Sequence, residues 1–209
     1  MKTRASFLLA FCLFMFAYAN IHAQSRWKIE VRAGRNFYIV EDILENWEGR
    51  WDFGAGTAFR ATPSLEVTAL AAYHHFAFDS GSVHPVLPLV IGFNYKIEGE
   101  DSYIIETSVG GRLRDPDDKR GPFLTLRGGI FYIRDGEIKV TIWYDDYSDN
   151  TVQTDHESTV TVKPFVSAGL GFKIPVTKRM KIILESGLTT TLKAEHMLVP
   201  LQATLQWGL

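Results

Sequence analysis

Apolar and polar side chains alternate strictly near both ends of this chain. From Trp27 to Ala33 every second residue is apolar and the residues between are charged, and from Val199 to Leu209 every second residue is again apolar. Successive side chains of a β-strand point to opposite faces of the sheet. Each segment therefore predicts an amphipathic strand with one apolar face and one polar or charged face.

The same alternation recurs along the chain between clusters of turn residues, as expected for an all-β domain. It predicts ten strands, over residues 26–36, 50–61, 65–78, 86–97, 102–114, 122–134, 137–146, 160–174, 180–192 and 198–209. After residue 23 the sequence contains no unbroken apolar run of the length that a membrane helix needs. If this domain spans a membrane, it must do so as a barrel.

The connections between these strands fall into two groups. One group is short, at 62–64, 98–101, 135–136 and 175–178, and the other is mostly longer, at 37–49, 79–85, 115–121, 147–159 and 193–197. Short turns at one end and longer loops at the other are typical of outer-membrane barrels. The pattern predicts an antiparallel up-and-down transmembrane β-barrel of ten strands. In an alternative with eight strands, 137–159 is one long surface loop and 102–114 lies outside the wall.

The first 23 residues have the features of an export signal. Lys2 and Arg4 precede an uncharged apolar run of about 15 residues, which is too short for a membrane helix. Cleavage is expected after Ala19 or Ala23, which leaves residues 24–209 as one barrel domain in the outer membrane of a Gram-negative bacterium. The only cysteine, Cys12, lies inside the signal, so the exported domain has no disulfide and no thiol catalysis.

Charged residues occupy many positions on the polar faces of the strands. Because buried charges are costly unless they are paired, we expect an ion-pair network across the lumen of the barrel. The predicted network contains Lys28, Glu30, Arg32, Arg50, Asp52, Arg60, Glu66, Glu106, Arg112, Arg127 and Glu185. Parity also points Lys96, Lys173 and Lys181 inward, and this surplus of Arg and Lys leaves a narrow anion-favouring passage open as an alternative.

Aromatic residues are expected at the two membrane boundaries, where amphipathic rings are favoured. In the ten-strand arrangement one girdle contains Trp27, Tyr95, Tyr103, Tyr132 and Trp207, and the other contains Trp51.

No arrangement of residues points to an enzyme, a metal site or a cofactor. The sequence has no Gly-x-Ser-x-Gly elbow, no His/Cys cluster with metal-ligand spacing and no phosphate-binding loop. Glu66 and His74 share a strand face but lie eight residues apart, roughly 26 Å at the rise of a strand. Without the signal the chain has 20 basic and 24 acidic residues, a formal charge of −4, which argues against nucleic-acid binding.

Several stretches resemble the small outer-membrane β-barrel domain family, which includes barrels of the OmpA type. They are 51–59 (WDFGAGTAF), 122–133 (PFLTLRGGIFYI), 164–175 (PFVSAGLGFKIP) with 178–181, and the closing segment 199–209. The resemblance implies contact with outer-membrane lipid and lipopolysaccharide, and with the assembly machinery during biogenesis. It also implies roles in envelope integrity or adhesion, without catalytic residues.

We therefore expect a non-enzymatic outer-membrane barrel with a structural or surface-interaction role. Two alternatives are a narrow anion-leaning channel and an exported soluble lipocalin-like barrel that binds an apolar ligand. The lipocalin-like alternative requires the apolar faces of the strands to point inward and the charged faces outward.

Overall fold

The computed structural model describes residues 26–38, 47–83, 93–115, 121–144, 151–194 and 196–209, so the predicted signal lies outside the described residues. Eleven strands are present among them. They are β1 (Trp27–Tyr38), β2 (Trp47–Arg60), β3 (Leu65–Phe78), β4 (Phe93–Gly99), β5 (Ser102–Arg114), β6 (Pro122–Asp135), β7 (Ile138–Tyr144), β8 (Thr151–His156), β9 (Thr159–Pro175), β10 (Met180–Thr191) and β11 (Met197–Gly208). The described part of the chain contains no helix long and apolar enough to cross a membrane.

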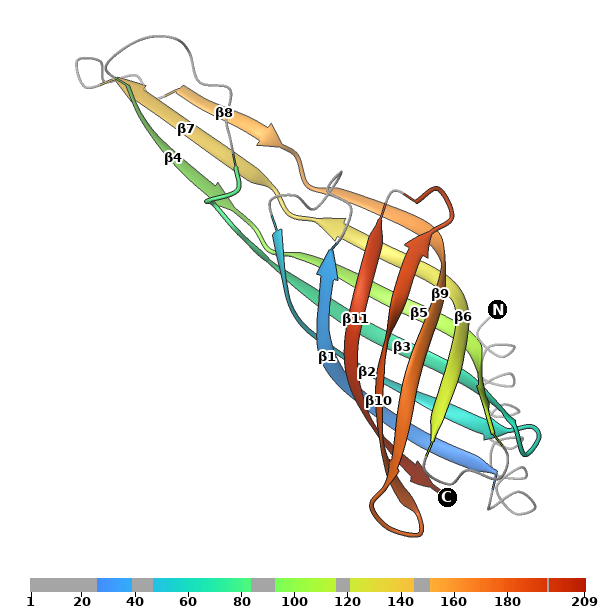
Figure 1. Ribbon diagram of the computed structural model, residues 1–209. Coiled ribbons are helices and arrows are strands. Elements are labelled where there is room, and N and C mark those ends of the chain that lie inside the picture. The colour runs from blue at the N-terminus through green and yellow to red at the C-terminus, as the bar shows by residue number, and fades with distance from the viewer. Residues whose placement is uncertain (1–25, 39–46, 84–92, 116–120, 145–150, 195) are drawn as a thin grey trace, which may run out of the picture.

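Eight of these strands close into an antiparallel barrel. Their order around the wall is β1-β11-β10-β9-β6-β5-β3-β2, and β1 completes the closure by pairing with both β2 and β11 (Figure 1). We call the end where β1 begins and β11 finishes the lower end, and the opposite end the upper end. The prediction of ten wall strands is wrong, and the alternative of eight has the correct number.

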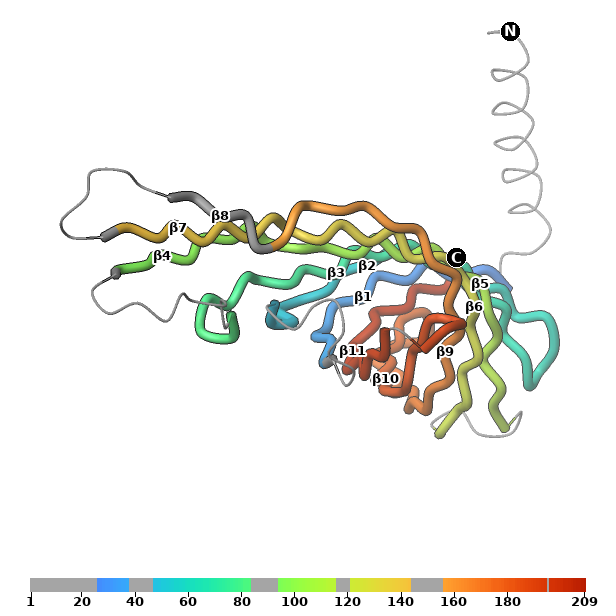
Figure 2. Tube along the Cα trace, turned by 90° about the horizontal axis from the view of Figure 1, so that it is seen from above, coloured from blue at the N-terminus to red at the C-terminus, as the bar shows by residue number. Residues whose placement is uncertain are grey.

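The other three strands form a separate sheet above the upper end, in the order β4-β7-β8, which we call the extension sheet. It continues three strands of the wall. The pairing of β5 with β6 reaches Tyr103 and Arg134, and that of β4 with β7 resumes at Gly99 and Ile138. Figures 1 and 2 show the extension sheet projecting to one side, beyond the rim of the barrel.

Two turn-like sequences explain the wrong strand count. Residues 98–101 and 135–136 look like hairpin turns, but each only interrupts a strand that then continues. Gly136 allows a close approach, since an added Cβ would collide with the carbonyl oxygen of Glu100. The amide of Gly136 donates to Ser102 Oγ at 2.7 Å, and that of Glu100 donates to the carbonyl of Glu137 at 2.9 Å. These bonds hold the two interrupted strands together.

The interruptions also change which connections share an end of the barrel. Residues 98–101 and 135–136 lie at the upper end. The end of β5 and the start of β6 lie at the lower end, where the turns at 62–64 and 176–179 also lie. The predicted grouping of the turns is therefore wrong for these segments. Within 137–159, β7 and β8 lie outside the wall, but they are strands of a separate sheet and not the long surface loop of the eight-strand alternative, and Thr159 already belongs to wall strand β9. In addition, Ser102–Arg114 is a wall strand between β3 and β6, and it is β4 that leaves the wall.

The barrel has its apolar side chains outside and its charged side chains inside. On β1, Ile29 and Val31 are 46% and 56% exposed, whereas Lys28, Glu30 and Arg32 are buried. This is the reverse of what the lipocalin-like alternative requires. A belt of exposed apolar side chains around a closed barrel is the arrangement that suits a hydrocarbon surround.

Placing a charge on this outer face tests whether it meets lipid. Val31 pairs with Ala55, which lies midway between Trp51 and Phe59 on β2. We expect Val31→Arg to lower the free energy of unfolding in lipid bilayers by about 2–4 kcal/mol, the cost of a cation near the bilayer midplane. Urea titration in phosphatidylcholine vesicles measures it. The matched control is Val176→Arg, in an exposed turn at the lower end. Equal, small losses for both variants would mean that the outer face meets water.

Candidate functional site

The lower part of the lumen is organised around Glu66 on β3. Its carboxylate is fully buried and accepts hydrogen bonds from the ammonium groups of Lys28 on β1 and Lys173 on β9. Both lysines are buried as well, and Lys173 also lies 5.5 Å from the ring centroid of Phe123. Because β6 and β5 lie between β9 and β3 in the wall, and β2 lies between β3 and β1, this triad reaches across the lumen.

Two further carboxylates hold the middle of the lumen. Glu30 on β1 accepts two hydrogen bonds from the guanidinium of Arg112 on β5, and a third from Gln206 Nε2 at 2.7 Å. Glu185 on β10 accepts from Arg127 on β6, and its other oxygen lies 3.8 Å from Arg112 Nε. The fork of Arg112 fits a carboxylate with two parallel hydrogen bonds, which makes this pair geometrically specific.

The upper part of the network contains the one buried histidine of the described wall strands, His74 on β3. Its Nε2 lies 3.0 Å from Glu106 Oε2, and Glu106 also accepts from Arg32 at 2.6 Å. Its Nδ1 lies 2.6 Å from Asn36 Nδ2, which donates to Asp52 at 2.9 Å. The polar groups therefore form a continuous hydrogen-bonded layer. Nucleophilic catalysis by a hydroxyl requires that hydroxyl to be hydrogen-bonded to a base such as an imidazole. The described layer contains an imidazole and carboxylates, but no hydroxyl is hydrogen-bonded to the imidazole.

Nine of the eleven predicted network residues take part in these contacts. They are Lys28, Glu30, Arg32, Asp52, Glu66, Glu106, Arg112, Arg127 and Glu185. Arg60 lies half-buried at the lower mouth. Arg50 is exposed on the outer surface, because a bulge between Gly49 and Trp51 reverses the parity of β2. Lys96 is exposed on β4 in the extension sheet, away from the lumen.

Sequence reasoning missed the contacts of His74, Asn36, Gln202 and Gln206. His74 lies an even number of residues from Glu66 on β3, so strand parity indicates from the sequence that its side chain points inward. Its acidic partners, however, lie on β2 and β5, so they are separated from it by 22 to 32 residues and cannot be recognised along one strand. Only the register of neighbouring strands brings these side chains to the same level of the barrel.

Above the charged network the lumen is filled by apolar side chains. Phe131 and Phe165 stack with ring centroids 3.9 Å apart and planes 10° from parallel. The rest of this apolar cluster consists of Trp47, Phe76, Val83, Ile104, Ile133, Ile138 and Leu198. Between the two layers lies a cavity of about 10 Å³ beside His74 and Arg127. That volume holds about one water molecule, so it offers no passage for solutes.

The outward aromatic residues form two groups. At the lower end, Trp27 packs against Phe59 with centroids 4.9 Å apart, and Trp207 is 51% exposed. At the upper end, neighbouring rings contact one another across β2, β3 and β5, and they are Trp51, Phe53, Tyr73, His75 and Tyr103. Trp51 and Phe59 are eight residues apart on β2, about 20 Å along the barrel axis for a typical tilt.

Three predicted girdle residues lie elsewhere than the ten-strand arrangement implies. Tyr103 and Tyr132 are near the upper end, on the same side as Trp51 and opposite to Trp27. Tyr95 is on β4 in the extension sheet, outside the barrel wall. All three displacements have one cause, which is the interruption of the long strands at residues 98–101 and 135–136.

Exposed ion pairs lie directly beside the upper aromatic group. Arg35 pairs with Glu48 at 2.5 Å, and its guanidinium lies 5.3 Å from the centroid of Phe37. Arg134 pairs with Glu100 at 2.9 Å and lies 5.8 Å from the centroid of Tyr103. Charged groups of this kind belong in water or among lipid headgroups. They mark the level at which the apolar band ends.

Within the described ranges, no group of three or more His, Cys, Asp or Glu side chains is arranged to hold a metal ion. The extension sheet has its own ion pairs, Lys96 with Glu98 at 2.5 Å and Lys139 with Glu137 at 3.0 Å. The hydrogen bond to Glu137 raises the pKa of Lys139 above its ordinary value. This face of the extension sheet is therefore charged and exposed, while Ile138, Val140 and Ile142 on the other face of β7 are buried.

Comparisons with known proteins find similarity at the level of structure. No protein-family model and no curated protein matches the sequence. Among solved structures, Ail, the attachment invasion locus protein of Yersinia pestis, has a TM-score of 0.48 and 12% identity over 88% of this chain and 97% of its own. Neisserial surface protein A has a TM-score of 0.49 and 10% identity, over 88% of this chain and 97% of its own. A major outer membrane protein from Thermus thermophilus has a TM-score of 0.45 and 10% identity, over 87% of this chain and 98% of its own.

Proposed function

We propose that this chain, whose fold is that of the small outer-membrane β-barrels of OmpA type, is an integral protein of the outer membrane of a Gram-negative bacterium. In this proposal it has a structural or surface-interaction role and no catalytic activity. The resemblance expected from the sequence is confirmed at the level of fold by the closed antiparallel barrel with its apolar outside and charged inside.

The short connections orient the barrel. The turns at 62–64 and 176–179 and the end of β11 are all at the lower end. Outer-membrane barrels have their short turns in the periplasm and their longer loops outside the cell. The upper end, with the extension sheet, is then the extracellular end.

The extension sheet is the single observation that carries the surface-interaction role. It begins above the ion pairs that mark the upper boundary, and β7 alone adds seven residues, about 23 Å of strand. A barrel needs no such structure to span the membrane. Loops and sheets beyond the rim of a rigid scaffold are where binding surfaces commonly lie. The exposed charged face with Lys96, Glu98 and Lys139 is the surface offered to a partner.

The filled lumen argues against the anion-leaning channel. Five of the cations that suggested such a passage are paired with carboxylates across the lumen, and the stacked Phe131 and Phe165 lie above them. The five are Lys28, Arg32, Arg112, Arg127 and Lys173. A barrel of eight strands has an interior that side chains just fill. The outer wall is the part that would contact lipid and lipopolysaccharide, and the assembly machinery would contact the chain during insertion.

Single cysteines test the location and the orientation together, because the predicted mature chain contains none. We expect Thr141→Cys, on β7 of the extension sheet, to react on intact cells with a maleimide that cannot cross membranes. The matched variant Ser64→Cys, in the lower turn, should react only after the outer membrane is permeabilised. Both proteins should be found in the outer-membrane fraction and should change gel mobility on heating.

Labelling of Ser64→Cys on intact cells with protection of Thr141→Cys would reverse the orientation and contradict the surface role. Recovery of the whole protein in the soluble periplasmic fraction would contradict membrane integration.

A further inference from the structure

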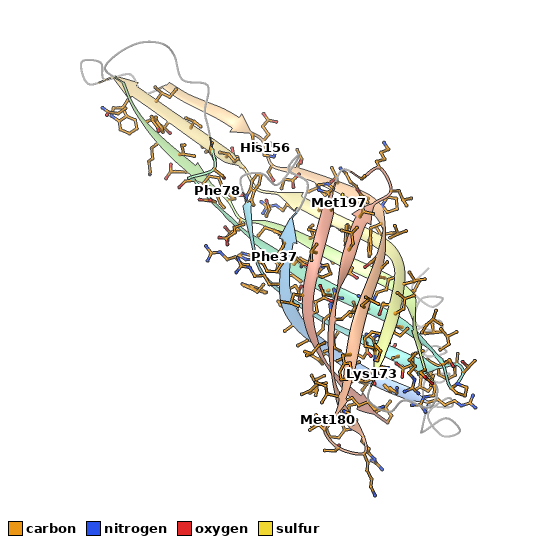
Figure 3. The ribbon with its side chains drawn as sticks, viewed as in Figure 1. Phe37, Phe78, His156, Lys173, Met180 and Met197 are labelled. Atoms are coloured by element: carbon orange, nitrogen blue, oxygen red, sulfur yellow. The ribbon has the colours of Figure 1, made fainter. Side chains whose placement is uncertain are left out.

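Five cations gather at the lower mouth of the barrel. They come from five different strands and point inward by strand parity: Lys28 on β1, Arg60 on β2, Arg114 on β5, Lys173 on β9 and Lys181 on β10. Figure 3 shows Lys173 near this end of the barrel, close to Met180 and far from Phe78 and His156. We call this set the mouth cluster.

The carboxylates of the described lumen do not balance the mouth cluster. Glu66 is the one carboxylate bonded to it, and it accepts from both Lys28 and Lys173. The next acids, Glu30 and Glu185, are bonded to Arg112 and Arg127 in the layer above. Five positive charges and one negative charge therefore leave a local surplus, although the exported domain as a whole is acidic.

Three of the cations have no carboxylate partner among the residues that the structure describes. One of them, Arg114, donates from Nε to the carbonyl oxygen of Pro63 at 3.2 Å. Arg60 has its Nε buried without a hydrogen-bond partner there. Lys181 is half-buried, and the positive charges of Lys28, Arg114 and Arg60 repel it, while Glu66 attracts it. Half-burial strengthens these repulsions, because the surroundings are less polarisable than water. Such an arrangement is favourable when an anion supplies the missing negative charge.

The donors suit a phosphate group. Guanidinium groups such as those of Arg60 and Arg114 bind phosphate oxygens through two parallel N–H donors, and lysine supplies a compact point charge. A dianion with three or four acceptor oxygens can contact cations that approach from several strands. A planar carboxylate has one charge and two oxygens, so it satisfies fewer of them. The ring of strands supplies the rigid frame that holds the donors apart.

We propose that the mouth cluster is a binding site for a phosphate group, open toward the periplasmic side, with Arg60 and Lys181 as its principal ligands. The phosphate belongs either to a free anion or to the headgroup of a lipid in the facing leaflet. The Glu30–Arg112 layer lies directly above the site, so the site is no part of a channel.

Purified full-length mature protein in a maltoside detergent, free of phosphate, tests the proposal. Inorganic phosphate is titrated by isothermal calorimetry at constant ionic strength, with chloride as the reference anion. We expect saturable binding of phosphate, weakened at least tenfold in the double variant Arg60→Gln, Lys181→Gln. The matched control is Lys178→Gln, which removes one positive charge at the same end from an exposed turn. It should bind phosphate as the unaltered protein does.

A second arm separates the two sources of phosphate. The protein is placed in nanodiscs of phosphatidylcholine with or without phosphatidic acid, and its thermal midpoint is recorded. A rise with phosphatidic acid that the double variant lacks assigns the site to a lipid headgroup. A rise only with inorganic phosphate assigns it to a free anion.

The proposal is overturned if the unaltered protein binds phosphate no better than chloride, or if the double variant binds it equally well. The heat-dependent gel shift must first show that each variant is folded, and Lys181→Gln alone provides a milder variant if the double one is not. This outcome is independent of the proposed function, because cysteine labelling on cells reports location and orientation whether or not phosphate binds.

Discussion

Replacing Glu66 by Gln should be among the most destabilising single changes in this barrel. We expect the free energy of unfolding to fall by about 3–5 kcal/mol, as when one partner of a buried ion pair is removed. Glu66 is 0% exposed and is the only described carboxylate bonded to Lys28 and Lys173, which are 6% and 2% exposed. Gln leaves both ammonium groups buried without a counter-charge. Urea titration in detergent micelles, followed by tryptophan fluorescence, measures the loss.

The matched control for this change is Glu48→Gln. Glu48 pairs with Arg35 at the upper rim, and both side chains are about half exposed. Exposed ion pairs contribute about 0–1 kcal/mol, so the control should unfold almost as the unaltered protein does. Equal losses for Glu66→Gln and Glu48→Gln would contradict the buried triad.

A third variant separates charge from shape at the same place. Replacing the whole triad by apolar residues, with Lys28→Met, Glu66→Leu and Lys173→Met, should recover much of the stability lost in Glu66→Gln. Well-packed apolar residues often replace a buried ion group at no net cost. If the triple variant is less stable than Glu66→Gln, the triad contributes more than the avoidance of unpaired charges.

Phe131→Ala is the second change with a large expected effect. Phe131 is 1% exposed and stacks on Phe165 with ring centroids 3.9 Å apart. Its ring also lies edge-to-face with that of His74, with the two ring centroids 6.3 Å apart. Truncation leaves a cavity between rigid strands that cannot collapse to fill it, so we expect a loss of about 3–5 kcal/mol. The same urea titration measures it.

Phe53→Ala is the control of the same residue type. Phe53 is 51% exposed on the outer face, so its removal should cost less than half as much as that of Phe131.

A second readout concerns the lumen. The unaltered protein should show no discrete conductance in planar bilayers, because Phe131 and Phe165 lie above a filled lumen. Discrete conductance steps would instead support the anion-leaning channel.

Strand parity needs only local sequence, and the places where it fails are local as well. It placed Lys28, Glu30 and Arg32 on the inward face of one strand, which needs only a period of two. It failed for Arg50 because the bulge at Gly49 to Trp51 adds one residue and reverses the faces above it. It could not find the contacts of His74, since these depend on the register between β2, β3 and β5.

The number of wall strands was decided by tertiary structure alone. The sequence near Asp135 and Gly136 is compatible with a hairpin turn, and also with a short interruption in a long strand. The choice depends on whether β7 pairs back on β6 or with β4 and β8, and that is a matter of distant hydrogen bonds. The same pairing decided that 98–101 is at the upper end and that Tyr103 is above, not below, the apolar band.

The sequence by itself determined that this is an all-β domain whose strands have one apolar face and one charged face. Alternation is a local property, and each strand carries it independently of its neighbours. Only the tertiary structure decided that eight strands close the wall, that three of them continue into the extension sheet, and that five cations meet around Glu66 at the lower mouth. These features depend on pairing between segments far apart in the chain, because closure and register arise only when all eight strands are hydrogen-bonded together.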